Sequence, residues 1–133
     1  IAEIARFLKE GAPLLLSVPW SARRHHIPHD YHRFTKERLT QLFREHNFSD
    51  VTINERGNDI AVIANKLIVV TIRVIKTTTL FNVILHIPLT IFFGVLSSIM
   101  LIAAHLSMVM RRGGNEDPLG YFCTATKSKH RDS

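Results

Sequence analysis

Four side chains that could act on a substrate lie close together in one polar loop: His29, Asp30, Tyr31 and Arg33. An imidazole or a carboxylate can act as a general base, and a phenol or a guanidinium can bind a polar or anionic group. The loop follows a short apolar run over residues 14–18, which is typical of a buried strand. Ligands bind at the carboxyl ends of strands in open α/β sheets. We therefore predict that these four side chains contact a substrate.

The same loop residues also have a purely structural interpretation. Asp30 could pair with Arg33 or accept hydrogen bonds from nearby backbone N–H groups. Tyr31 and Phe34 could anchor the loop to the core. The sequence alone leaves both interpretations open.

Histidines are unusually frequent in this loop, at positions 25, 26, 29 and 32. Imidazole nitrogen is a common zinc ligand, so a metal-dependent hydrolase is one alternative. Asp30 is the single carboxylate among them, the only cysteine is far away, and the spacing matches no zinc motif. We therefore predict no metal site and interpret these imidazoles as solvated.

Local signals define the elements that position the loop. Residues 1–9 have helical apolar spacing, and Gly11 follows as a stop. The continuous apolar run 14–18 predicts a strand that is buried on both faces, as in a parallel sheet. Thr35 predicts an N-cap, followed by a helix whose apolar face contains Leu39, Leu42, Phe43 and His46 and which stops at Asn47.

Two further strands are predicted, with a long insertion between them. Residues 50–55 alternate like a strand with one exposed face, and residues 121–126 resemble a strand that precedes a disordered tail over 128–133. We expect the divisions 1–57 for the main domain, 58–117 for a hydrophobic helical insertion and 118–127 for the final strand.

The insertion is predicted to be helical and apolar. Asn58 and Asp59 can cap a helix over 60–76, whose basic residues Lys66 and Arg73 lie opposite its apolar face: Ile60, Ile63, Ala64, Leu67, Val70 and Val74. The next 34 residues, 77–110, contain no Asp, Glu, Lys or Arg. His86 and His105 lie within this run, and we interpret them as packed or interfacial groups.

Several stretches of the chain resemble one family. They are residues 3–11, 14–19, the Pro-His-Asp-Tyr-His-Arg-Phe-Thr run over 28–35, Asn47-Phe48 and Gly120-Tyr121. Together they resemble the C-terminal half of a class I S-adenosylmethionine-dependent methyltransferase, over residues 1–57 and 118–127. Phe7, Glu10 and Ala12 depart from the family's usual first stretch.

The resemblance implies a fold and an activity. Residues 13–18, 50–55 and 120–126 would be the fifth, the sixth and the antiparallel seventh strand of a Rossmann-like α/β sheet. The Gly-rich turn and the acidic residue that bind S-adenosylmethionine would lie upstream of Ile1, since the six glycines form no G-x-G pattern. We expect the isolated chain to be unable to transfer a methyl group.

The insertion also predicts contact with a membrane. Its two ends lead into strands of one sheet, so an even number of crossings is required, and 34 uncharged residues are too few for two of about 20. A re-entrant hairpin bent near Pro88 or helices in the interface fit better. The predicted membrane contacts are Lys66, Arg73, Phe92, Phe93, Arg111 and Arg112. The alternative is a helical cap that packs on protein.

Composition limits the remaining classes. The formal net charge is +6, but no basic run is interleaved with aromatic residues, so we expect no nucleic-acid partner. The single cysteine suits a reducing compartment. We expect a cytoplasmic protein that is peripheral or monotopic at a membrane and methylates a small or lipid-linked acceptor. A non-catalytic membrane-associated module is the main alternative.

Overall fold

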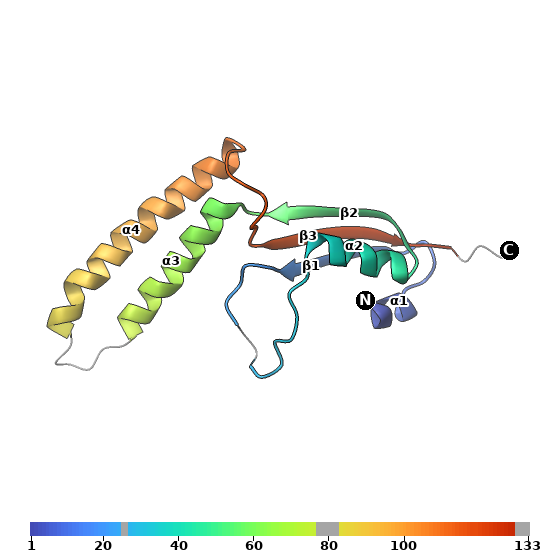
Figure 1. The fold of residues 1–133 in the computed structure, drawn as a ribbon, viewed down its shortest axis with the longest axis horizontal. Helices are drawn as coiled ribbons and strands as arrows, with labels where there is room; N and C mark the ends of the chain where they lie inside the picture. Colours follow the sequence, from blue (N-terminus) through green and yellow to red (C-terminus); the bar gives the residue numbers. More distant parts are fainter. Residues whose placement is uncertain (25–26, 77–82, 130–133) are drawn as a thin grey trace. The chain divides into compact units, whose positions relative to one another are not determined.

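The structure, a computed structural model, describes residues 1–24, 27–76 and 83–129 (Figure 1). The elements in chain order are α1 (Ala2–Phe7), β1 (Pro13–Pro19), α2 (Lys36–Glu45), β2 (Phe48–Arg56), α3 (Asp59–Lys76), α4 (Val83–Val109) and β3 (Gly120–Lys127). The chain divides into two compact units, a sheet unit (Ile1–Arg56 with Leu119–Ser133) and a hairpin unit (Gly57–Pro118). The fold is therefore mixed α/β, with a three-stranded antiparallel sheet.

The last strand occupies the middle of the sheet. The order is β1-β3-β2, and β3 is antiparallel to both neighbours, with Cys123 opposite Leu16 on one side and Ile53 on the other (Figure 1). β1 and β2 consequently run in the same direction without being hydrogen-bonded to each other. This order differs from the usual doubly wound sheet, in which the strands are mostly parallel.

The core of the sheet unit lies on one face of the sheet. Leu39 and Phe43 of α2 are 1% and 0% exposed and pack against Cys123 and its neighbours. Side chains of α1 and its flanks, including Ala5, pack against the same cluster. Two helices thus cover this face, because their apolar residues recur at helical spacing.

The prediction that β1 is buried on both faces is wrong. Its residues alternate between exposed and half-buried, and Leu15 is 69% exposed. Within the described residues of the sheet unit, α1 and α2 cover only the face that carries Leu14, Leu16 and Val18. An apolar run shows that a strand can be buried on both faces, but burial of the second face requires a second covering layer.

Several predicted local signals are confirmed. The Thr35 side chain accepts a hydrogen bond of 3.1 Å from the Arg38 N–H and so caps α2. Asn47 ends that helix at a φ of 57°. Helix α1 ends earlier than predicted, at Phe7 with an extended Leu8, so Gly11 (φ 75°) lies in the turn that follows and does not stop the helix. β3 ends at Lys127, as predicted, and the Ser128 N–H donates to the Asn47 carbonyl; most of the predicted tail, residues 130–133, lies outside the described residues.

The hairpin unit consists of two antiparallel helices with a polar, small-residue contact. Asn58 Nδ2 donates to Ser107 Oγ at 2.9 Å, and the hydroxyls of Thr71 and Ser97 are 2.8 Å apart. The other buried residues of the two helices include Ala61, Val62, Ala64 and Ala104. Asn58 also caps α3, since its Oδ1 accepts from the Ala61 N–H. Small side chains thus allow the two helices to approach closely.

Two expectations about this unit need correction. Pro88 lies inside α4 and marks no hairpin bend, because α4 already begins at Val83; the connection from α3 falls within 77–82, outside the described residues. Ile63 and Val70, expected on the packed face of α3, are 52% and 38% exposed. The small residues of α3 contact α4 in their place, since bulky side chains would hold the helices apart.

One helix is long and apolar enough to cross a membrane. The stretch His86–Val109 has a mean hydropathy of 2.2, and only 11% of its most apolar window is buried. A helix that is apolar around its whole circumference is stable where all of its sides avoid water. This unit therefore carries a large apolar surface.

Cys123 provides a test of the sheet core. The residue is 0% exposed, and burial raises the pKa of its thiol above the ordinary value. At pH 8 we expect a thiol reagent to label it at least about 100-fold more slowly in native protein than in urea. Equal labelling rates in a time course followed by mass spectrometry would contradict the packing of β3.

Candidate functional site

The polar loop between β1 and α2 is anchored at both ends. At its start, the Trp20 N–H donates to the Leu119 carbonyl at 3.0 Å, and the indole centroid lies 6.4 Å from that of Tyr121. At its end, Phe34 packs against the core, and Thr35 begins α2. The expected anchoring role thus holds for Phe34. Tyr31, in contrast, is 71% exposed.

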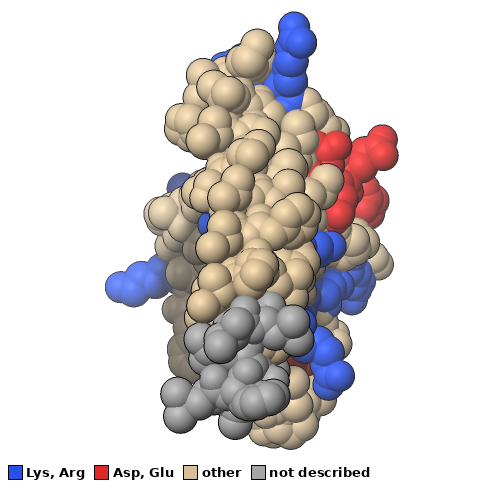
Figure 2. Space-filling view, turned by 90° about the vertical axis from the view of Figure 1, so that its left-hand side faces the viewer, with Lys and Arg blue, Asp and Glu red and all other residues tan. Residues whose placement is uncertain are grey.

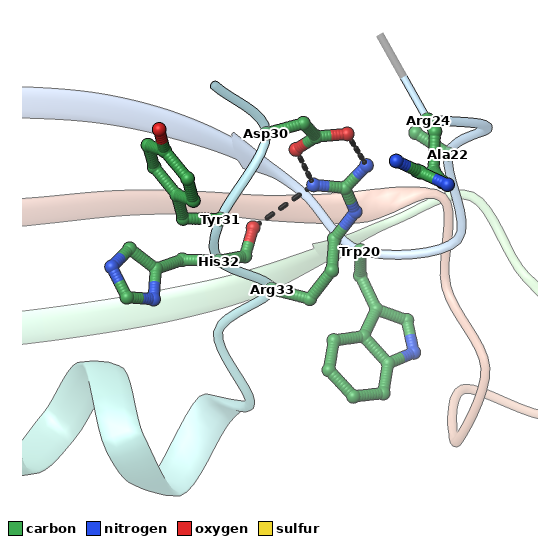
Figure 3. Close-up of a pocket in the computed structure, with 7 residues that line it drawn as sticks. All are labelled: Trp20, Ala22, Arg24, Asp30, Tyr31, His32 and Arg33. Carbon is green, nitrogen blue, oxygen red and sulfur yellow. Dashed lines mark hydrogen bonds and ion pairs between the residues drawn. The ribbon is translucent and has the colours of Figure 1, made fainter. Parts of the chain in front are cut away.

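A pocket of about 330 Å³ lies within this loop, at the carboxyl end of β1. Ligand sites commonly have volumes of about 300–1,000 Å³. Figure 3 shows Asp30 and Arg33 in the middle of the lining, with Tyr31 and His32 on one side and Arg24 on the other. The lining residues are Trp20, Ala22, Arg24, Asp30, Tyr31, His32 and Arg33.

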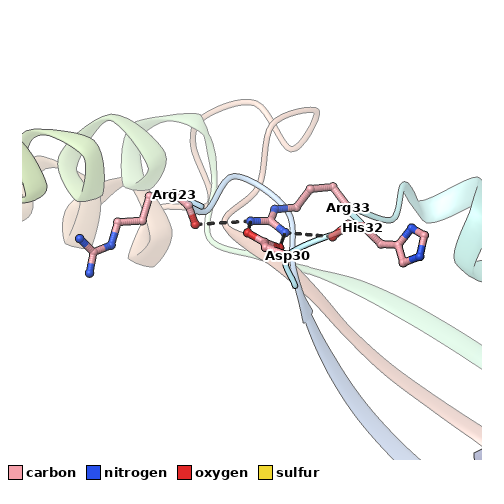
Figure 4. Close-up of polar contacts among 4 residues, drawn as sticks. All are labelled: Arg23, Asp30, His32 and Arg33. Carbon is pink, nitrogen blue, oxygen red and sulfur yellow. Dashed lines mark hydrogen bonds and ion pairs between the residues drawn. The ribbon is translucent and has the colours of Figure 1, made fainter. Parts of the chain in front are cut away.

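Asp30 and Arg33 form a two-pronged ion pair. Arg33 Nη2 donates to Asp30 Oδ2 at 2.7 Å, and Arg33 Nη1 donates to Asp30 Oδ1. The guanidinium also donates to the carbonyls of His32 at 2.9 Å and Arg23 at 3.4 Å (Figure 4). The hydrogen bond to Asp30 raises the pKa of Arg33. The pair therefore ties the two halves of the loop together.

This pairing supports the structural interpretation of Asp30 and Arg33. Their side chains are only 10% and 25% exposed, and both charged groups are engaged with each other. A carboxylate held by a guanidinium is a poor general base, because the neighbouring positive charge favours its ionised form. Asp30 and Arg33 therefore hold the loop in shape, and their contact with a substrate stays a prediction.

His29 and Tyr31 are the more accessible pair. His29 Nδ1 lies 3.1 Å from the Tyr31 hydroxyl, within hydrogen-bonding distance, and both residues are exposed. His32 lies beside Phe34, with ring centroids 5.5 Å apart. An imidazole hydrogen-bonded to a phenol can take up or release a proton.

Of the four histidines in this loop, the structure describes His29 and His32. His25 and His26 lie outside the described residues. In the part of the chain that the structure describes, no three His, Cys, Asp or Glu side chains are grouped so as to hold a metal ion.

Sequence reasoning missed Trp20 and Arg24 as pocket residues. Both lie in the same loop, and the Arg23-Arg24 pair directly after the strand end was a usable signal. A guanidinium in the lining would suit an anionic group on a ligand. Arg24 thus joins His29 and Tyr31 as a candidate for ligand contact.

The predicted membrane contacts lie in the hairpin unit. Lys66 and Arg73 are exposed on α3, and Phe92 of α4 is 60% exposed. Phe93 is half-buried, and its carbonyl accepts from the Thr71 hydroxyl at 3.2 Å. The remaining candidates, and the two histidines of the apolar run, fall in or just after α4: Arg111, Arg112 and His105 are exposed and His86 is half-buried.

Loss of the guanidinium should open the loop. In Arg33→Met, the mostly buried Asp30 carboxylate loses its partner, and an unsatisfied buried charge costs about 1–3 kcal/mol. We expect trypsin to cut after Arg23 or Arg24 roughly tenfold faster than in the parent chain. Arg38→Met, which removes an exposed arginine of α2, should leave the rate unchanged. Equal cleavage in both variants would mean that the pair does not hold the loop.

The start of α2 is tied to β2 by an ion pair whose contribution should depend on pH. Lys36 Nζ lies 2.7 Å from Glu55 Oε1. The hydrogen bond lowers the pKa of Glu55 and raises that of Lys36. The ion pair therefore stabilises the fold above the ordinary Glu pKa, and this stabilisation is lost as pH falls through the lowered pKa of Glu55. At high pH it is lost as pH rises through the raised pKa of Lys36.

Urea titrations followed by Trp20 fluorescence can check this dependence. Glu55→Gln should lower the free energy of unfolding by less than about 1 kcal/mol between about pH 5 and 10, because half-exposed ion pairs are weak. The difference from the parent chain should vanish near pH 3. A difference that stays constant down to pH 3 would assign the effect to something other than charge.

Comparison with known proteins does not assign this chain to a family. No family model, no curated protein and no solved structure matches this chain. What the structure defines is a mixed α/β chain with a loop pocket at a strand end and an apolar helical hairpin. Its function is argued below from these features.

Proposed function

We propose that this chain is the acceptor-side, C-terminal part of an S-adenosylmethionine-dependent methyltransferase. The observation that carries the proposal is the pocket in the loop after β1, whose lining includes residues 30–33 of the stretch that resembles the family's Pro-His-Asp-Tyr-x-Arg-Phe-Thr run. A pocket at the carboxyl end of a strand is the usual ligand position in an α/β sheet. The Asp30–Arg33 pair also links the two described parts of the loop, which favours the fixed geometry that acceptor positioning requires.

The strand directions support the same proposal. The resemblance implies that the final strand runs antiparallel to the two before it, and β3 is antiparallel to both β1 and β2. α2 connects β1 to β2, which run in the same direction. A Rossmann-like parent sheet is part of the proposal and goes beyond the three strands described.

One turn of the kind that can bind a nucleotide lies at the start of α3. Gly57 follows a strand and leads into α3, the kind of turn that can bind a nucleotide, but this helix start is closed. The N–H groups of Asp59, Ile60 and Ala61 bond to the Gly114 carbonyl, Asp59 Oδ1 and Asn58 Oδ1. The proposal therefore places S-adenosylmethionine on residues upstream of Ile1, and no step through it is derived.

His29 and Tyr31 have a defined role in this proposal. Methyl transfer mainly requires an acceptor atom placed in line with the donor. Where that atom carries a proton, His29 can accept it, and the Tyr31 hydroxyl 3.1 Å away orients the imidazole. His29 is not itself in the pocket lining but is hydrogen-bonded to Tyr31, which is, and Arg24 supplies positive charge in that lining.

Methyl transfer by the product of the complete reading frame tests the proposal. The donor is methyl-labelled S-adenosylmethionine, and the acceptors are a lipid extract and an aqueous extract of the source cells. His29→Gln should lower kcat/KM by about 100-fold or more. His46→Gln, outside the pocket at the end of α2, should leave it near the parent value. Unchanged activity in both variants, or no transfer at all, would reject the assignment.

The hairpin unit supports an apolar or lipid-linked acceptor at a membrane. Its longest helix is largely exposed and is long and apolar enough to cross a bilayer. We propose that this unit keeps the enzyme at the cytoplasmic surface as a peripheral or monotopic protein. In the transfer assay, the label should then appear in the organic phase. Label confined to the aqueous phase would contradict this acceptor class.

A non-catalytic membrane module is the second candidate. The closed start of α3 and the exposed apolar surface of α4 favour it, since α4 could contact a membrane and the start of α3 cannot bind a nucleotide. Vesicle co-sedimentation and equilibrium dialysis of the complete product with S-adenosylmethionine separate the two candidates. Vesicle binding with cofactor binding supports the enzyme, and vesicle binding alone supports the module.

A further inference from the structure

The hairpin unit has polar groups inside and large apolar side chains outside. Its helix contact contains Asn58, Thr71, Ser97 and Ser107, joined by hydrogen bonds. Figure 2 shows a broad surface without charge, with Lys, Arg, Asp and Glu at its margins. Exposed apolar residues of α4 include Ile91, Phe92, Val95, Ile99, Leu101, Ile102 and Leu106, all at least 51% exposed. Small residues inside and bulky residues outside are typical of helices that pack within lipid.

The contacts fix which residues of the two helices lie side by side. Asn58 contacts Ser107, and Thr71 contacts Ser97. Because the helices are antiparallel, Ile63, five residues after Asn58, lies level with Ile102, five residues before Ser107. Ile72, which follows Thr71 directly, lies near the level of Val95 on α4.

The two basic residues of α3 form a ridge that points away from α4. Lys66 and Arg73 are exposed and seven residues apart, which is nearly two full turns of a helix. They lie on the side opposite Ala61, Ala64 and Thr71, which are buried. Lys66 is in the middle third of α3. If α3 crossed a bilayer, this ammonium group would face lipid near the centre, which is costly.

We propose that the hairpin lies in the plane of one leaflet in two layers. The Lys66–Arg73 ridge of α3 faces anionic head groups, and α4 lies beneath α3 among the acyl chains. Packed helices are about 8–10 Å apart, so the outward side of α4 lies at least that much deeper. Both ends of the unit join the same place in the sheet, where the Leu119 N–H bonds to the Arg56 carbonyl at 2.9 Å, so the chain enters and leaves by one face. This inference rests on the membrane association proposed above.

Tryptophan depth measurements test the layering. In a Trp20→Phe background, Ile63, Ile72, Val95 and Ile102 are replaced by tryptophan one at a time, and the full chain is bound to phosphatidylglycerol–phosphatidylcholine vesicles. Lipids brominated at different acyl positions then report depth by quenching. We expect positions 63 and 72 to share one shallow depth and positions 95 and 102 to share one deeper value.

The alternatives give different patterns. A hairpin that crosses the bilayer would place positions 63 and 102 at one depth and positions 72 and 95 at another, which would overturn the layering. No quenching at any position would overturn membrane association itself. Protection of Cys123 from a thiol reagent verifies that the Trp20→Phe background is folded. If that protection is lost, a polarity-sensitive dye takes the place of tryptophan as the reporter. The dye is attached to single cysteines at the same four positions in Cys123→Ala.

A charge test addresses the head groups. Lys66→Gln with Arg73→Gln should weaken partitioning to anionic vesicles about 30-fold, the change expected for two basic side chains at such a surface. Lys9→Gln with Arg44→Gln removes the same charge from exposed positions of the sheet unit and should change it little. Equal losses in the two variants would assign the effect to net charge and overturn the proposed ridge.

Discussion

Replacing Phe43 by alanine should lower the free energy of unfolding of the sheet unit by about 3–5 kcal/mol. The side chain is 0% exposed and sits between α2 and the sheet, with its ring centroid 5.6 Å from that of Phe48 in an edge-to-face arrangement. Alanine would leave a cavity that the paired strands cannot close. Urea titration followed by Trp20 fluorescence measures the loss, since Trp20 is the single tryptophan and packs against Tyr121.

The matched control is Phe7→Ala. Phe7 is 73% exposed at the end of α1, so its replacement should change the free energy of unfolding by less than about 0.5 kcal/mol. Phe43→Ala with a loss as small as that of Phe7→Ala would show that α2 does not form the core described here.

The features of the fold that depend on residues close together in the sequence could be predicted. Thr35 caps α2, Leu39 and Phe43 recur at i and i+4 on its buried face, and Asn47 ends it at a positive φ. Each of these features needs only a few consecutive residues, so the pattern determines the structure locally.

The parts that depend on distant residues could not be predicted. Leu15 lies in an apolar run that suits burial on both faces, yet its exposure depends on what covers the outer face. In α3, Ile63 and Ala64 are both apolar, and periodicity cannot tell which of them faces α4. Close approach of the helices selects Ala64 and leaves Ile63 outside. The predictions therefore failed where packing between separate elements determines which residues are buried.

The candidate site shows the same division. The i, i+3 spacing of Asp30 and Arg33 made their pairing one of two interpretations, and the structure shows the pair. Trp20 and Arg24 also line the pocket: the Arg23-Arg24 pair after the strand end is a local signal for Arg24, whereas no local pattern indicates Trp20.

The second large effect is expected for Gly120→Ala, at the start of β3. A Cβ atom built on Gly120 would lie 2.4 Å from the Val18 carbonyl oxygen and 3.2 Å from the Pro19 Cα. These are backbone atoms of β1, and Gly120 is opposite Pro19 on one side and Arg56 on the other, so neither strand can give way freely. We expect a loss of about 3 kcal/mol in the same urea titration, at the upper end for overpacked sites.

The position of Gly120 also links the sheet to the pocket. Pro19 is followed directly by Trp20, which begins the loop and lines the pocket. Displacing β1 at this point should therefore open the loop, and trypsin should cut after Arg23 or Arg24 faster than in the parent chain. Gly94→Ala is the matched control, because its added Cβ meets nothing within 4 Å. If Gly120→Ala destabilises the sheet unit but leaves loop cleavage unchanged, the loop is held by the Asp30–Arg33 pair alone, and the end of β1 has no part in shaping the pocket.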